Sequence, residues 1–394
     1  MLKIQKYKSD LVTMGLLMLS IATSAFVSVE PAPTDIFFIL FLALAIVLNQ
    51  LYFSKSAMFG LFLVVLFLLM NFISFFFVTS ISMSIPYIVI TIYMAVMWIG
   101  VVGFGGYCGV SSLKNISSIY YFVGLITAVV AIAVYFRIIP YYEEFFLFER
   151  VKLFFKDPNV LGPFLIFPAL YAISKYEEQK KMIYMFSFFI ITSGVILSFS
   201  RAAWLNLAVA ILVYLFLPKF KEKRGRLKVV AVFIFLLIAG LALITTNTKL
   251  QTQFTERLGI QHYDAERFNS QKDASLIGFT DPLGNGPGQS EVLLDIAPHN
   301  LFARLLIENG LLGVTSFILL IVSAIVMAFK GVINSGEYRY YYMIIFSTII
   351  GQIVNSLFID TLHWRHLWLI VALAWIPYKT KEENHENCST DYKI

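Results

Sequence analysis

Long apolar segments recur along nearly the whole chain and are separated by short polar connections. An apolar run of about 20 residues is long enough to cross the hydrocarbon core of a bilayer. The pattern therefore predicts an all-α polytopic membrane protein, a single domain over residues 1–394 with about twelve transmembrane helices. The predicted segments are 11–29, 35–53, 57–78, 84–105, 117–137, 158–174, 182–198, 202–217, 228–246, 298–328, 340–358 and 364–378.

Three of these segments have unusual boundaries. The segment 298–328 is longer than one straight span needs, so we expect it to be broken or to extend beyond the bilayer. The segments 182–198 and 202–217 are almost continuous, so we expect a tight turn at Phe199-Ser200-Arg201.

Composition and charge support the same class. The chain is 59% hydrophobic and only 14% charged, whereas soluble domains carry about 25% charged residues. With the N-terminus in the cytoplasm, the inner connections hold 19 basic and 9 acidic residues, and the outer ones 11 and 15. This bias satisfies the positive-inside rule with both termini cytoplasmic. The basic run Lys219–Arg226 is therefore explained as a topology determinant, and no nucleic-acid partner is expected.

The basic residues predicted outside differ in kind from those inside. Seven of the eleven are arginine, whereas lysine dominates on the inner side. The planar fork of arginine grips phosphate oxygens in pairs, and lysine acts as a point charge. The outer arginines indicate an anionic ligand on that face, or else ion pairs with the outer acidic residues.

The longest polar interruption, residues 247–297, is predicted to be an external loop between the ninth and tenth spans. Loops of this length are usually functional or disordered, and we expect this one to carry part of an active site. It contains Gly284, Gly286 and Gly288. No Lys-Ser/Thr follows them, so a nucleotide loop is excluded. The glycines would let the backbone turn sharply and approach the membrane or a ligand.

His299 is the candidate general base. It follows Pro298 and is expected in the first turn of the tenth helix, where the positive end of the helix dipole favours neutral imidazole. A neutral histidine can accept a proton; the alternative is a hydrogen-bonded histidine at the membrane interface. Asn300, Arg304 and Glu308 follow at four-residue spacing and form one polar stripe. Arg304 would contact substrate or pair with Glu308.

Arg201 lies at the outer end of the seventh and eighth segments, where it would bind an anion or snorkel to the interface. Asp157 is expected to cap the helix that follows it. The charges and aromatic residues of 140–157 predict an interfacial helix. Trp364 and Trp368 are expected in an interfacial belt, with sugar stacking as the alternative. The histidines are scattered without metal-ligand spacing, so neither a metal nor a cofactor is expected.

Four segments together resemble the bacterial O-antigen polymerase and O-antigen ligase family, over about residues 150–325. They are Lys156-Asp-Pro-Asn-Val-Leu-Gly162, Ser200-Arg-Ala-Ala-Trp-Leu205, Arg267 followed by Asp281-Pro-Leu-Gly-Asn-Gly-Pro-Gly288, and His299-Asn-Leu-Phe-Ala-Arg-Leu-Leu-Ile-Glu-Asn-Gly-Leu-Leu-Gly313. The first 150 residues match only in hydropathy. Asn285 departs from the family, which often has a small aliphatic residue there.

The resemblance implies a GT-C-like, metal-independent glycosyltransferase in the bacterial inner membrane, acting at its outer face on a polyprenyl-pyrophosphate-linked glycan. Arg201 and Arg267 would hold the pyrophosphate, and His299 would accept the proton of the acceptor hydroxyl. The turn Gly284–Gly288 and Asn300 would shape the site. A chain-length regulator is a further expected partner.

Three functions compete at this point. The first is a polymerase that joins lipid-linked repeat units of O-antigen, capsule or exopolysaccharide. The second is a ligase that transfers the finished glycan to lipid A core in lipopolysaccharide. A secondary transporter or flippase is more distant, because polar residues gather near one face and not at the midplane of several spans.

Overall fold

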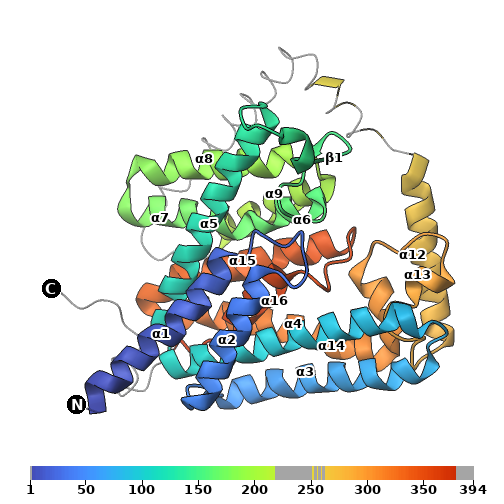
Figure 1. The fold of residues 1–394 in the computed structure, drawn as a ribbon, viewed down its shortest axis with the longest axis horizontal. Helices are drawn as coiled ribbons and strands as arrows, with labels where there is room; N and C mark the ends of the chain where they lie inside the picture. The colour runs from blue at the N-terminus through green and yellow to red at the C-terminus, as the bar shows by residue number, and fades with distance from the viewer. Residues whose placement is uncertain (1, 218–250, 253–254, 256–258, 260–261, 379–394) are drawn as a thin grey trace.

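The computed structural model describes residues 2–217, 251–252, 255, 259 and 262–378, and this part of the chain is almost entirely helical (Figure 1). Its strands are one short antiparallel pair, β1 (Phe146–Leu147) and β2 (Arg150–Val151). The α-helices are α1 (Leu2–Ala22), α2 (Pro33–Val47), α3 (Lys55–Ser74), α4 (Ile81–Cys108), α5 (Ser111–Tyr135), α6 (Pro158–Phe164), α7 (Ile166–Gln179), α8 (Met182–Leu197), α9 (Arg201–Phe216), α12 (His262–Thr280), α13 (Ser290–Leu293), α14 (Leu301–Asn334), α15 (Arg339–Ser356) and α16 (Arg365–Leu373).

Every predicted segment within the described residues overlaps helix, although the helices that match 11–29, 35–53 and 364–378 end several residues early; segment 228–246 lies outside the described residues. Among the described residues, four helices are long and apolar enough to cross a membrane: Lys55–Phe77, Ile81–Cys108, Ser111–Tyr135 and Leu301–Asn334. Side chains such as Ile39, Phe62 and Val326 are about half exposed. Apolar surface of this kind is typical of a protein that faces lipid.

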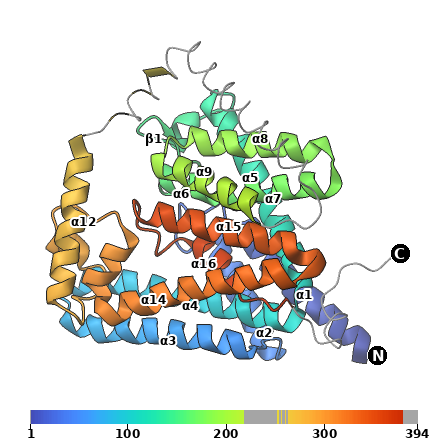
Figure 2. The same ribbon diagram turned by 180° about the vertical axis from the view of Figure 1, so that it is seen from behind.

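Three of the long helices share one direction, the long helix α5 is inclined to them, and a shorter helix crosses the ends of two of the three (Figure 1). Helices α3, α4 and α14 run side by side, with α15 and α16 between them and the group formed by α7, α8 and α9 (Figures 1 and 2). Helix α12 lies across the ends of α4 and α14, opposite the end where α1 begins (Figure 1). We call this side of the molecule the α12 end.

The connection between α8 and α9 is the tight turn that the sequence predicts. Phe199 has a left-handed backbone with φ of 47°. Ser200 then caps α9, because its hydroxyl accepts a hydrogen bond from the backbone N–H of Ala203. Arg201 is the first residue of α9 and therefore lies at the α12 end.

The predicted interfacial helix over 140–157 is wrong. A 3-10 turn (Tyr142–Phe145) leads into the β1–β2 hairpin, whose turn residues Phe148 and Glu149 have φ of 48° and 60°. The helical spacing of the charges is coincidental. The aromatic side chains do not form one apolar face; Phe155 is buried against Phe164 in α6.

Helix α14 is interrupted at Gly310, which has φ of 68° and ψ of −174°. The break that the length of segment 298–328 suggests is therefore present. The turn after α12 fills the gap in the hydrogen bonding. The N–H groups of Asn285 and Gly286 donate to the carbonyls of Ile307 and Glu308, and Leu311 N–H donates to Pro282 O, each at 2.9 Å. Backbone groups released by a broken helix are thus satisfied by this turn.

We expect Gly310→Ala to destabilise the protein more than Gly336→Ala. Both glycines have positive φ, which costs an alanine about 1–2 kcal/mol. A Cβ on Gly310 would also lie 2.2 Å from Pro282 O, whereas nothing lies within 4 Å of one on Gly336. The total for Gly310→Ala should reach at least about 3 kcal/mol. Thermal unfolding of the detergent-solubilised variants measures the difference. Equal losses would show that the packing of the turn against α14 is unimportant.

Candidate functional site

A cavity of about 400 Å³ opens at the α12 end between α6, α9 and α12. Its apolar wall contains phenylalanine, leucine and isoleucine side chains. Its polar wall contains three arginines and one carboxylate among the charged lining residues. The polar lining residues are Arg150, Asn159, Ser200, Arg201, Tyr263, Asp264, Arg267 and Gln271. The cavity therefore carries a net positive charge and suits an anionic ligand.

Arg201 and Arg267, far apart in sequence and both predicted to bind substrate, line this same cavity. Arg201 reaches it from the first turn of α9. Its Nη1 and Nη2 donate to the two carboxylate oxygens of Asp264 at 3.0 and 2.6 Å. Arg267 is one turn further along α12 and lies over the ring of Tyr263, with 4.7 Å between guanidinium carbon and ring centroid.

The sequence did not single out the third arginine of the cavity, Arg150. It follows the hairpin turn in β2, and its Nε donates to Ser198 O at 3.0 Å. Its Nη2 donates to Asn159 Oδ1 at 2.7 Å. Asp157 caps α6 as predicted, accepting from the backbone N–H of Asn159 at 2.6 Å. The cap thereby fixes Asn159, and Asn159 fixes Arg150 against the cavity.

His299 does not lie in the first turn of α14, contrary to the prediction. It precedes the N-cap residue Asn300 and has a left-handed backbone with φ of 44°. Its side chain is partly buried and is not among the residues that line the cavity. The sequence analysis placed the beginning of the helix at Pro298. Asn300 is a preferred N-cap residue, so α14 begins after it and His299 lies outside the helix.

The surroundings of His299 nonetheless favour the neutral form. Burial lowers the pKa of His299 below its usual value of 6.5, and the positive charge of Arg267 lowers it further. The carboxylates of Asp360 and Asp157 act in the opposite direction. His299 thus lies within electrostatic reach of the cavity and has the neutral imidazole that a proton acceptor requires.

Asn300 holds the beginning of α14. Its Oδ1 accepts hydrogen bonds from the N–H groups of Phe302 and Ala303 at 2.9 and 3.0 Å. Its Nδ2 donates to Leu357 O at 3.0 Å. The side chain therefore joins α14 to the α15–α16 connection, next to Phe358 and Ile359 of the cavity wall.

Arg304 is almost fully buried and belongs to an ion-pair network, which was one of its two predicted roles. Its Nε donates to Glu308 Oε1 at 3.1 Å, and its Nη1 donates to Asp360. Glu291 of α13 lies 3.9 Å from Nη2, and the guanidinium lies 4.4 Å from the ring centroid of Tyr87. The network ties α4, α13, α14 and the α15–α16 connection together at the α12 end.

The three predicted site glycines pack the turn against neighbouring helices. A Cβ on Gly284 would lie 2.4 Å from Glu308 O in α14. One on Gly286 would lie 2.3 Å from Val78, and one on Gly288 2.6 Å from the ring of Tyr87. All three have positive φ. Their close approach is to α14 and the region of α3 and α4, and they do not line the cavity.

Trp368 is not part of an interfacial belt. It is 2% exposed, and its indole N–H donates to Leu362 O at 2.6 Å. Its ring contacts Phe67 and Phe317 inside the bundle. Hydropathy alone does not distinguish a tryptophan at the interface from one buried between helices.

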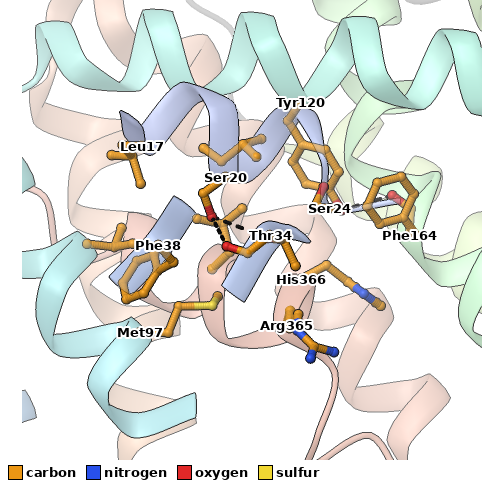
Figure 3. A pocket seen from close by; sticks show the side chains of 13 residues that line it. Leu17, Ser20, Ser24, Thr34, Phe38, Met97, Tyr120, Phe164, Arg365 and His366 are labelled. Carbon is orange, nitrogen blue, oxygen red and sulfur yellow. Dashed lines mark hydrogen bonds between the residues drawn. The ribbon is translucent and has the colours of Figure 1, made fainter. Parts of the chain in front are cut away.

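A second hollow, of about 20 Å³, lies between α1, α2 and α16 and includes Arg365 and His366 (Figure 3). This volume holds about one water molecule, so the hollow is too small for a glycan or a lipid headgroup. Arg365 is engaged by Asp35 of α2, with Nε–Oδ1 and Nη2–Oδ2 distances of 2.7 Å.

The described residues contain no group of three or more histidine, cysteine, aspartate or glutamate side chains placed to hold a metal ion. No model of a known protein family matches the chain, and no curated protein resembles it significantly. The geometry at the α12 end therefore carries the functional argument.

The pKa of His299 should lie below 6.5 and should rise when Arg267 is replaced by glutamine. The neighbouring positive charge disfavours the imidazolium, so its removal makes protonation easier. NMR titration of protein labelled with ¹³C-histidine measures this value, and His299→Gln assigns the signal. A pKa for His299 that is unchanged in Arg267→Gln would place the two groups out of electrostatic contact.

Proposed function

We propose that the protein is a polysaccharide polymerase of the bacterial inner membrane. It joins polyprenyl-pyrophosphate-linked oligosaccharide repeat units at the outer face, with about twelve spans in a GT-C-like arrangement and both termini in the cytoplasm. The observation that supports this most is the convergence of Arg201, Arg267 and Arg150 on one cavity. A pyrophosphate is the anion that several arginine forks suit best.

In the proposed reaction, the acceptor hydroxyl attacks the anomeric carbon of the donor sugar. The bond from that carbon to the pyrophosphate oxygen breaks, and polyprenyl pyrophosphate leaves with the bonding electrons. The arginines of the cavity stabilise the charge that develops on the leaving group. His299, whose lowered pKa favours the neutral form, accepts the proton of the attacking hydroxyl. The donor's isoprenoid part would meet apolar side chains at the cavity wall, such as Leu205 and Phe268.

The burial of Arg304 limits its part in this reaction. The side chain is 6% exposed and is committed to Glu308 and Asp360. Breaking such a network leaves buried charges unpaired, which is costly. We therefore assign Arg304 to holding α14 and the α15–α16 connection in place around His299, and we assign anion binding to the arginines of the cavity.

Deletion of the gene should remove the ladder of long surface glycan, leaving single repeats on the carrier or on the surface acceptor. Complementation with His299→Ala should restore almost none of it, since loss of a general base costs roughly 10²–10⁴-fold in rate. Gel profiles of surface glycan and of lipid-linked intermediates measure this, with membrane insertion checked by immunoblot. Long polymer stranded on the carrier would identify a ligase. An unchanged profile after deletion would indicate transport, and near-normal glycan from His299→Ala would refute the base assignment.

Arg201→Lys and Arg267→Lys should each lower polymer synthesis by about ten- to a hundredfold, because a lysine keeps the charge but loses paired hydrogen bonds to phosphate. Lys272→Arg is the matched control, since this residue is exposed on the same helix and does not line the cavity. In vitro transfer from a lipid-linked donor measures the rates. If both lysine variants match the parent, the arginines do not bind the pyrophosphate.

A further inference from the structure

We propose that Asp264 occupies the pyrophosphate position on Arg201 when no ligand is bound, and that an incoming pyrophosphate displaces it and releases the first turns of α12. The inference rests on the proposed function for the identity of the anion. It adds a control step: the helix that forms one wall of the cavity also supplies the group that closes it.

The first argument is the geometry of the ion pair. Each oxygen of Asp264 accepts from one terminal nitrogen of Arg201: Oδ2 from Nη1 at 3.0 Å and Oδ1 from Nη2 at 2.6 Å. The carbonyl of Gly259 accepts from Nη1 as well, at 3.3 Å. The end of the guanidinium is therefore engaged by the segment around the beginning of α12. Carboxylate and phosphate use the same paired geometry on arginine, so the two cannot occupy this position together.

The second argument is where α12 is anchored. Its later turns pack on α14: Ala274 is fully buried beside Ala303 and Ile307, and a Cβ on Gly278 would lie 2.6 Å from Leu306. In the first turns, Ala265 is exposed, and Tyr263 and Asp264 are only partly buried. The first turns can therefore move without unpacking the later ones.

The third argument is the balance of charge. The Arg201 side chain is 37% exposed and that of Asp264 is 14% exposed. Water reaches the pair through the partly exposed Arg201 and screens it, which lowers the free energy needed to open it. A pyrophosphate carries more negative charge than one carboxylate, and Arg150 and Arg267 line the same cavity. Exchange of the carboxylate for the pyrophosphate is therefore favourable.

A different role for Asp264 predicts the opposite outcome. If the carboxylate only held Arg201 in position for the ligand, the ligand would use the remaining N–H groups while Asp264 stayed bound. Removing the carboxylate would then weaken anion binding, and the ligand would rigidify the beginning of α12.

The test is peptide-resolved hydrogen exchange on the full-length protein in lipid nanodiscs, with and without inorganic pyrophosphate. In the parent, pyrophosphate should increase exchange over residues 263–268 and leave residues 271–279 unchanged. In Asp264→Asn, residues 263–268 should already exchange without ligand as fast as those of the parent do with pyrophosphate. Adding pyrophosphate to this variant should cause no further increase. Its affinity for pyrophosphate should be about two- to fivefold tighter, since a weak competing ion pair has been removed.

Asp273→Asn is the matched control, because Asp273 is exposed on the same helix and does not line the cavity; it should behave as the parent. Slower exchange of 263–268 with pyrophosphate, or weaker binding by Asp264→Asn, would overturn the competition and leave Asp264 as a positioning residue. Failure of the parent to bind pyrophosphate would overturn both proposals. If Asp264→Asn binds pyrophosphate more tightly but the parent has no polymerase activity, Asp264 still competes with pyrophosphate for Arg201. Only the proposed polymerase reaction is then rejected.

Discussion

The turn Pro282–Gly286 is hydrogen-bonded to the broken helix α14, and the arrangement of the whole α12 end depends on this contact. The break at Gly310 leaves backbone carbonyls without their helical partners, and Asn285 and Gly286 supply the N–H groups. Helix α12 ends just before this turn and α13 begins just after it. The contact thereby places α12 across the bundle, and with it Asp264 and Arg267 of the cavity wall. It also holds the first part of α14, which begins two residues after His299.

Two electrostatic regions meet at this end of the molecule. Around Arg304, one buried guanidinium faces the carboxylates of Glu308, Asp360 and Glu291. In the cavity, arginine side chains outnumber the single lining carboxylate, Asp264. The first region stabilises the fold because its charges are satisfied internally. The second retains unbalanced positive charge, which is unfavourable without a ligand and is typical of a binding site.

Local patterns predicted the helices well and the contacts between them poorly. The positions of the apolar segments, the cap at Asp157, the turn at Ser200 and the Arg304–Glu308 pair all follow from spacing within one element. The β1–β2 hairpin was missed because the charges around it repeat at helical spacing, while the burial of Phe155 against Phe164 depends on a contact outside the segment. Asp264 and Arg150 were missed because their importance arises from partners on other elements. The glycines at 284, 286 and 288 correctly predicted a close approach of the backbone. Only the fold shows that the neighbours are α14 and the region of α3 and α4.

The ion pair between Asp35 and Arg365 joins residues 330 positions apart. Chains are made from the N-terminus, so in a membrane protein α2 would enter the bilayer long before α16 exists. Until Arg365 is made, the carboxylate of Asp35 can accept from the backbone N–H of Ala32 but lacks the guanidinium that balances its charge. Asp35 is almost fully buried, and a charge that is buried without its partner is costly, so α2 should not pack fully until Arg365 is present. Synthesis of α16 would then complete the packing of α2, so a helix near the start of the chain depends on a residue made 330 positions later.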